Sequence, residues 1–148
     1  MAETRTAEAT WSGDLVSGNG MLLYVSSGAY TRLPVTWSSR TEAHGGKTSP
    51  EELLAAAHAT CFSMAFGNEL GKNGTPATRL DVRVEVTADK REAGWTVLSS
   101  AITVTGVVDG IDQATFAELA HAAKDGCPIS RAIVGNVELS VEATLAAS

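Results

Sequence analysis

Two cysteines are the residues of this sequence best suited to nucleophilic or redox chemistry. Cys61 and Cys127 lie far apart in the chain, and neither has the neighbouring cysteine or histidine that a structural zinc site requires. A cysteine becomes a strong nucleophile only as its thiolate, which a nearby positive charge stabilises. The alternative for Cys61 is an inert role in the core, because free cysteine is among the most buried residue types. Taken alone, its apolar context favours that alternative.

Cys61 lies on the strongest predicted helix of the sequence. The segment Ser49-Pro50-Glu51-Glu52 combines an N-cap serine, a proline at the first helical position and a glutamate three residues after the cap, which together form a capping box. Residues 53–70 are rich in Ala, Leu, Met and Phe and carry almost no charge before Glu69. Because this helix is apolar nearly all round, we expect it to be buried in a core or an interface.

Arg40 and Glu51 are candidates for activating the Cys61 thiol. Arg40 stands near the start of a polar, glycine-rich segment, residues 38–48, which we interpret as a loop. Its guanidinium stays charged and can bind a carboxylate bidentately while another N–H faces a sulfur. Glu51 projects from roughly the same helical face as Cys61, about three turns earlier. From spacing alone, however, a solvated arginine and a carboxylate favoured by the helix dipole are the preferred interpretation.

Cys127 and His58 have local contexts that allow either a chemical or a structural role. Cys127 directly precedes a short predicted helix, residues 129–134, whose exposed N–H groups would stabilise a thiolate. A buried cap residue is an equally good interpretation. His58 shares a helical face with Cys61 and has the side chain of a base or a metal ligand, but a packed or interface histidine is preferred.

The other predicted elements define the fold class. The strands are expected over residues 6–11, 21–25, 32–37, 79–87, 95–108 and 136–145, and a second long helix is expected between Asp112 as its cap and Gly126 as its end. Strands and helices do not alternate strictly, so the class is α+β rather than a doubly wound sheet. We find no repeat and no linker, and therefore expect a single domain over residues 1–148.

Charge and hydropathy limit the classes of partner and the cellular compartment that we expect for this protein. The net charge is −6, from 11 basic and 17 acidic residues, and no stretch gathers the basic side chains that a phosphate backbone needs. The N-terminus lacks the apolar core of a signal peptide, and no run reaches the roughly 18 apolar residues of a spanning helix. We expect a cytoplasmic protein without nucleic-acid or membrane partners. In that compartment a disulfide is normally transient.

Two segments carry a specific family resemblance. Residues 48–65, TSPEELLAAAHATCFSMA, resemble the central-helix signature of the osmotically inducible protein C (OsmC) and organic hydroperoxide resistance (Ohr) family. Residues 127–133, CPISRAI, resemble that family's second cysteine motif. The similarity extends to residues 11–13, 39–42, 94–96 and 107–116, and so covers nearly the whole chain. The position of Arg40 and the residues around Cys61 are more similar to the OsmC branch of the family than to the Ohr branch.

The resemblance implies both an architecture and an activity. The architecture is an OsmC-like α+β fold, with antiparallel sheets around a long buried central helix, in an intertwined homodimer with two sites between its subunits. The activity is reduction of organic hydroperoxides: the residue matching Cys61 attacks the peroxide, and the one matching Cys127 forms a disulfide that a dithiol reductant reopens. The residues matching Arg40 and Glu51 activate the thiolate. No metal or organic cofactor is required.

Two other functions compete with the peroxidase interpretation. In the first, the protein is a non-enzymatic binding module whose apolar helix lines a pocket for a small hydrophobic ligand. In the second, it is a redox sensor that uses the same disulfide with little turnover. The resemblance, rather than composition, makes the enzyme the preferred interpretation. The sequence names neither the physiological peroxide nor the reductant.

Overall fold

The computed structural model describes residues 1–147 of the protein. The chain forms two compact units, residues 1–53 and residues 54–147. Helix α2 (Pro50–Lys72) begins in the first unit and continues into the second. Its predicted start is confirmed: the Glu52 backbone N–H donates to Ser49 Oγ at 3.1 Å, and the Glu52 carboxylate accepts a hydrogen bond from Thr48 Oγ1 at 2.9 Å.

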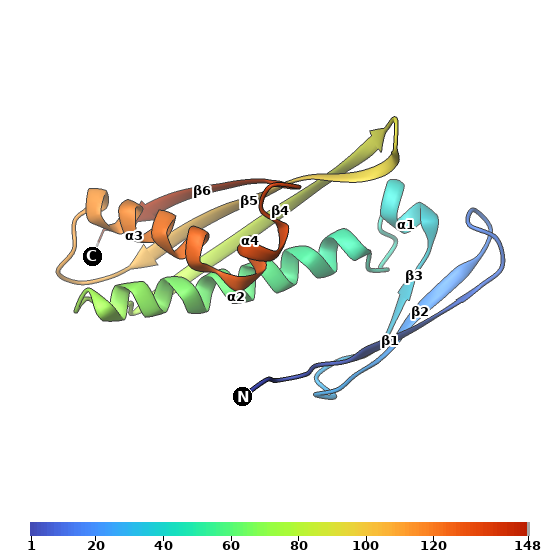
Figure 1. Ribbon diagram of the computed structural model, residues 1–148, viewed down its shortest axis with the longest axis horizontal. Helices are drawn as coiled ribbons and strands as arrows, with labels where there is room; N and C mark the ends of the chain where they lie inside the picture. The colour runs from blue at the N-terminus through green and yellow to red at the C-terminus, as the bar shows by residue number, and fades with distance from the viewer. Residues whose placement is uncertain (148) are drawn as a thin grey trace. The chain divides into compact units, whose positions relative to one another are not determined.

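The first unit is built on a three-stranded antiparallel sheet, drawn in blue in Figure 1. Its strands are β1 (Ala7–Ser12), β2 (Asn19–Val25) and β3 (Thr31–Val35), in that order. They confirm the three predicted strands, although β3 ends before the predicted Trp37. Every residue of β1 is exposed, and the buried apolar side chains of this sheet are Leu22 and Val25 on β2.

A short helix, α1 (Trp37–Thr41), follows β3. The prediction of a loop over residues 38–48 is therefore wrong for the first residues of that segment. A reciprocal capping box starts the helix: the Ser39 N–H donates to Thr36 Oγ1 at 3.1 Å, and the Thr36 N–H donates to Ser39 Oγ at 3.0 Å. A five-residue helix has too few turns to show an apolar period, and the glycines that follow it dominate the pattern.

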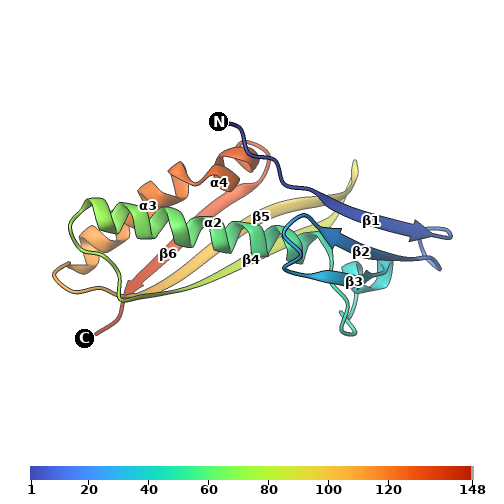
Figure 2. The same cartoon turned by 90° about the horizontal axis from the view of Figure 1, so that it is seen from below.

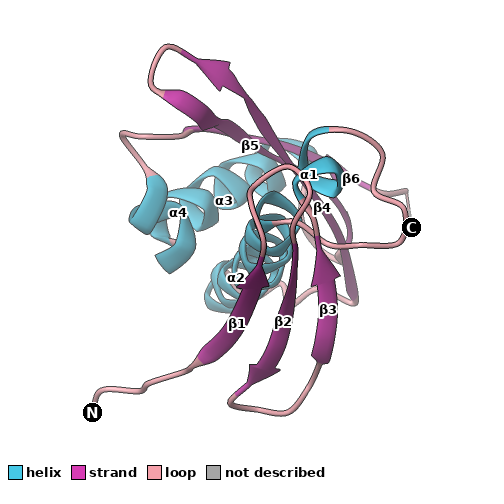
Figure 3. Ribbon diagram, turned by 90° about the vertical axis from the view of Figure 1, so that its right-hand side faces the viewer, coloured by secondary structure: helices cyan, strands magenta, loops and turns pink. Residues whose placement is uncertain are grey.

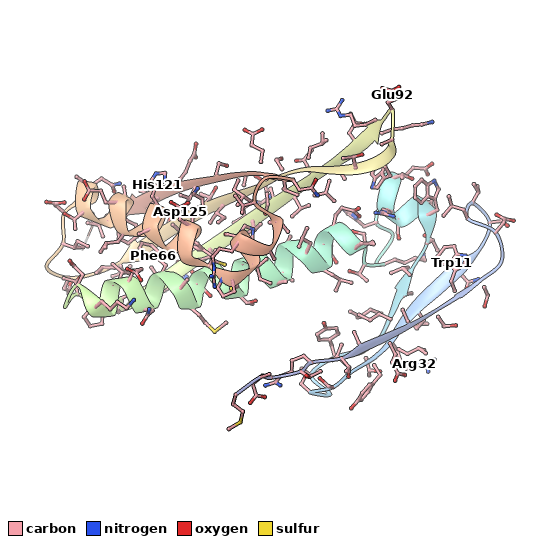
Figure 4. The ribbon with its side chains drawn as sticks, in the orientation of Figure 1. Trp11, Arg32, Phe66, Glu92, His121 and Asp125 are labelled. Atoms are coloured by element: carbon pink, nitrogen blue, oxygen red, sulfur yellow. The ribbon has the colours of Figure 1, made fainter. Side chains whose placement is uncertain are left out.

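The second unit contains the sheet β4-β5-β6, formed by β4 (Arg79–Arg91), β5 (Gly94–Val107) and β6 (Glu138–Leu145). The predicted hairpin is confirmed: β4 and β5 pair antiparallel down to Arg91 opposite Gly94. Figure 4 shows Glu92 at the tip of this hairpin. The half-buried positions of β4 alternate with exposed ones as predicted, and the strand is longer than predicted.

Strand β6 corrects the expectation of purely antiparallel sheets, because it pairs with β5 in parallel from Ser99 opposite Glu138 to Gly106 opposite Leu145. Parallel neighbours need a connection that crosses back over the sheet. Here α3 (Gln113–Gly126) and α4 (Pro128–Ile133) form this connection. Figure 2 shows both helices on the path from the last residue of β5 to the first residue of β6. The alternation of β6 predicts a strand but says nothing about its direction.

The core of the second unit lies between its helices and the sheet, as Figure 3 shows. One face of α2 is buried at every fourth residue, at His58, Phe62, Phe66 and Leu70. Phe62, Phe66 and Leu70 pack in one cluster with Phe116 of α3 and with apolar residues of β5 and β6. The ring centroids of Phe66 and Phe116 are 4.9 Å apart. On another face of α2 the side chain of Met64 is 70% exposed. The prediction that α2 is buried on all its faces, in a core or an interface, stays a prediction.

Candidate functional site

The two cysteines meet in the second unit. Cys61 is half-buried on α2, whereas Cys127 is fully buried, at the point where α3 ends and α4 begins. Cys127 is the N-cap of α4, as predicted, and Figure 4 labels Asp125 near the end of the preceding helix. The two side chains lie close enough for each to affect the pKa of the other, and both thiols are free. The fold therefore brings together the two residues singled out from the sequence.

The environment affects the two thiols in opposite directions. Burial raises the pKa of Cys61, and so does the neighbouring Cys127 thiol, although the Ile129 N–H and the charge of Arg131 lower it. Burial also acts to raise the pKa of Cys127. That effect is outweighed by the neighbouring Ser130 N–H, Cys61 thiol, Ser130 hydroxyl and Ile129 N–H, and the net pKa is lowered. Cys127 therefore ionises more readily than Cys61.

His58 is fully buried one turn before Cys61 on α2. Its Nδ1 lies 2.6 Å from Ser100 Oγ on β5, and its Nε2 lies 2.7 Å from Ser130 Oγ on α4. Burial lowers the pKa of this imidazole, which is therefore neutral at neutral pH. The preferred prediction, a packed histidine, is confirmed.

Arg40 and Glu51 form an ion pair within the first unit. Arg40 Nε and Nη2 both donate to Glu51 Oε1, at 2.9 Å and 2.8 Å. The Arg40 guanidinium also lies over the Trp37 ring, with its Cζ 5.7 Å from the ring centroid. The two charged side chains are 29% and 11% exposed. The contact that spacing alone did not favour is thus formed, and α1 and the first turn of α2 hold its two partners.

An apolar pocket adjoins this ion pair in the first unit. Its volume is about 340 Å³, and its walls include Trp11, Leu15, Val35 and Trp37, with Arg40 contributing the charge. Figure 4 labels Trp11 on β1. A pocket of this size and composition fits a small ligand with an apolar body and one polar end.

Two kinds of feature, clusters of metal-ligating side chains and membrane-spanning helices, are absent from residues 1–147. Within residues 1–147, no three or more His, Cys, Asp or Glu side chains are grouped so that they could hold a metal ion. No helix in the same range is long and apolar enough to cross a membrane.

Sequence reasoning missed two polar neighbours of the cysteines, Ser130 and Arg131, and one polar partner of His58, Ser100. Ser130 and Arg131 lie within the second cysteine motif, and each occupies a place on the short helix directly after Cys127, so a signal existed for both. Ser100 lies in an ordinary alternating strand. Its contact with His58 depends on the packing of β5 against α2, which no local pattern reveals.

Comparison with known proteins gives a consistent result. A sequence model described as "OsmC-like protein" matches residues 43–142. Peroxiredoxin OsmC of Escherichia coli is 36% identical over 138 residues, covering 93% of this chain and 95% of that protein. An organic hydroperoxide resistance protein-like sequence of Staphylococcus aureus is 32% identical over 107 residues, covering 70% of this chain and 74% of that protein.

Solved structures show the same fold. The organic hydroperoxide resistance protein OhrB of Bacillus subtilis aligns with a TM-score of 0.71 at 25% identity, covering 94% of this chain and 98% of that one. An organic hydroperoxide resistance protein of Elizabethkingia anophelis aligns with a TM-score of 0.73 at 21% identity, covering 99% and 100%. With the family model and the E. coli relative, these matches establish that the chain belongs to the OsmC-like protein family.

Proposed function

We propose that the protein is a thiol-dependent peroxidase that reduces organic hydroperoxides to alcohols, with Cys61 as the attacking thiolate and Cys127 as its disulfide partner. The observation that carries this proposal is that the two cysteine side chains, from separate elements, lie close enough for each to affect the pKa of the other. A disulfide requires the two sulfurs to come within about 2 Å, so neighbouring cysteines are favourably placed to form one. The names of the E. coli and S. aureus relatives support a role in peroxide stress.

The reaction proceeds in three balanced steps. The Cys61 thiolate attacks the terminal peroxide oxygen, the O–O bond breaks, and the alkoxide leaves and takes a proton to become the alcohol. Cys61 is then a sulfenic acid. The Cys127 thiolate attacks that sulfur, the S–O bond breaks, and the departing hydroxide becomes water. A dithiol reductant opens the disulfide by thiol exchange and is itself oxidised.

Arg40 and Glu51 have the activating role in this proposal. Burial raises the pKa of Cys61 overall, even though the charge of Arg131 lowers it, so the thiolate needs a further cation that stays charged. A guanidinium meets that need, and the hydrogen bonds to Glu51 Oε1 fix its orientation. The single domain over residues 1–148 stays a prediction.

The substrate is expected to be an organic rather than an inorganic peroxide. The pocket beside Arg40 has a volume of about 340 Å³ and mostly apolar walls. An alkyl or aryl hydroperoxide gains free energy by burying its apolar part there, whereas hydrogen peroxide has almost no apolar surface to bury.

We also propose that the protein is a cytoplasmic homodimer. The exposed side of α2 carries Ala56, Ala57, Thr60 and Met64, a weakly polar surface that a second copy would cover. Free thiols that cycle through a disulfide require a reducing compartment. Light scattering should give twice the chain mass for the wild type, and Met64→Glu should shift the equilibrium towards monomers. A monomeric wild type would contradict this assembly.

The experiment that tests the activity measures consumption of cumene hydroperoxide and of hydrogen peroxide with a dithiol. The wild type is compared with Cys61→Ser and Cys127→Ser. We expect the wild type to prefer the organic peroxide, Cys61→Ser to be inactive, and Cys127→Ser to form a sulfenic acid without dithiol turnover. Full activity in Cys61→Ser, or none in the wild type with any dithiol tried, would favour a binding module. Oxidation with little turnover would favour a redox sensor.

A further inference from the structure

His58 is a buried titratable side chain that the proposed mechanism leaves without a role. It is 0% exposed, and each of its ring nitrogens lies within 2.7 Å of a serine hydroxyl: Ser100 Oγ at Nδ1 and Ser130 Oγ at Nε2. These serines come from β5 and α4, so the ring is held from two sides. It connects α2 to the short helix whose N-cap is Cys127.

The neighbours of the ring determine which nitrogen carries its proton. Burial keeps the imidazole neutral by lowering its pKa, so it has one donor and one acceptor. The Ser130 hydroxyl lowers the pKa of Cys127, which requires its proton to point at the sulfur. Its oxygen is then free to accept from Nε2–H, and Nδ1 accepts from Ser100. All the hydrogen bonds from Ser100 to Cys127 thus run in one direction, and such chains strengthen each other.

We propose that His58 is a positioning residue for Cys127: the neutral ring holds the Ser130 hydroxyl with its proton directed at Cys127 Sγ. The catalytic consequence rests on the proposed function. When the Cys127 thiolate attacks the Cys61 sulfenic acid, one S–S bond forms, one S–O bond breaks, and the hydroxide takes a proton to become water. Because the thiolate is the reacting form, a hydrogen bond that keeps the proton off Cys127 speeds this step.

Other charged and titratable groups on the surrounding elements do not duplicate this contact. From α3, Lys124 Nζ lies 2.9 Å from Asp125 Oδ1, so these two charges largely offset each other. From α4, Arg131 exerts its charge on Cys61. From α2, the Cys61 thiol itself affects the pKa of Cys127, and β5 has no charged residue. The Ser130 hydroxyl is therefore the contact through which His58 acts.

The direct test is a titration of Cys127 in a Cys61→Ser background. Cys127 is then the one cysteine of the chain, and the ultraviolet absorbance of its thiolate reports ionisation without any reagent having to reach a buried sulfur. Adding Ser130→Ala or His58→Phe should raise the pKa of Cys127 by about one unit, the value of one lost hydrogen bond. Ser130→Thr, which keeps the hydroxyl, and Ser99→Ala, the neighbour on β5, should leave it unchanged.

Two outcomes would overturn the inference. In the first, Ser130→Ala folds and titrates like its parent. In the second, Ser130→Ala shifts the pKa but His58→Phe does not, so that Ser130 acts without the ring. If His58→Phe does not fold, Ser100→Ala tests the same chain of hydrogen bonds from its far end, where loss of the donor to Nδ1 should raise the pKa by a smaller amount; an unchanged pKa would again contradict the role of His58.

A single-turnover experiment then separates this inference from the proposed function. In the two-cysteine protein, Ser130→Ala should slow disulfide formation roughly tenfold near neutral pH, in proportion to the thiolate lost, and leave sulfenic acid formation at Cys61 unchanged. If the wild type forms no sulfenic acid with cumene hydroperoxide, the proposed function fails. The titration of Cys127 still decides the role of His58 in that case.

Discussion

The two units hold their polar side chains in opposite ways. In the first, Arg40 and Glu51 form an ion pair that keeps some contact with water, at 29% and 11% exposure. In the second, Cys127 and His58 are fully buried, and His58 is held by hydrogen bonds to two serine hydroxyls. Arginine stays charged under all ordinary conditions, so it needs solvation and a carboxylate. Thiol and imidazole change charge readily, so burial and hydrogen bonding can set their protonation state.

The largest expected effect tests the charged half of this comparison. Arg40→Met should reduce kcat/KM for cumene hydroperoxide roughly a hundredfold, because loss of a neighbouring positive charge raises a thiol pKa by about two units. The pH optimum should move upward for the same reason. Steady-state assays across pH measure both. Arg83→Met, which removes an exposed arginine of β4, is the control and should keep full activity. An Arg40→Met protein within twofold of the wild type would show that the ion pair is structural.

The next effect contrasts the packing of the two units. Phe66→Ala removes a fully buried ring that packs on Phe116, and should lower the free energy of unfolding by about 3–5 kcal/mol. Tyr24→Ala in the first unit removes a side chain that is 46% exposed and should change it by less than about 0.5 kcal/mol. Urea unfolding followed by circular dichroism measures both. Equal losses would mean that the first unit also depends on a core.

A smaller expected effect on stability tests how closely the Phe116 ring of α3 packs against the sheet. A Cβ at Gly106 would lie 2.5 Å from Phe116 Cζ, so Gly106→Ala forces the ring to move and should cost about 1–3 kcal/mol. Gly71→Ala is the matched control, because no atom lies within 4 Å of its Cβ position and alanine favours the helix by up to about 1 kcal/mol. Thermal unfolding should therefore shift in opposite directions for the two variants. A neutral Gly106→Ala would indicate that the Phe116 ring is not tightly held.

The smallest effect concerns the neutral half of the comparison. The pKa of His58 is lowered in the folded state, so below the ordinary value of 6.5 the unfolded state binds more protons than the folded state. The free energy of unfolding therefore decreases as the pH is lowered below that value. The loss is at most about 1.4 kcal/mol per pH unit. His58→Phe should reduce the loss of stability at acid pH, measured by urea unfolding at a series of pH values. His121→Gln should leave that loss unchanged, because His121 lies exposed on α3 (Figure 4). If His58→Phe lost as much stability at acid pH as the wild type, the acid sensitivity would belong to other groups.

Local patterns predict most elements of the fold because the physical signals are local. The caps at Ser49 and Asp112 use side chains that bond to backbone N–H groups three residues later, at 3.1 Å and 2.7 Å, and sequence spacing reveals them directly. The alternation of β4 follows from having one buried face. Helix α1 was missed although its cap is local, because five residues give no period.

The sequence by itself determined the family, the helices and strands other than α1, and the four candidate residues Cys61, Cys127, Arg40 and Glu51. Only the tertiary structure decided the parallel pairing of β6, the proximity of the two cysteines, and the two serine partners of His58. The physical reason is distance along the chain. Caps and periods act over a few residues, whereas these contacts join segments that meet only when α2 and α3 pack on the sheet and exclude water from between them.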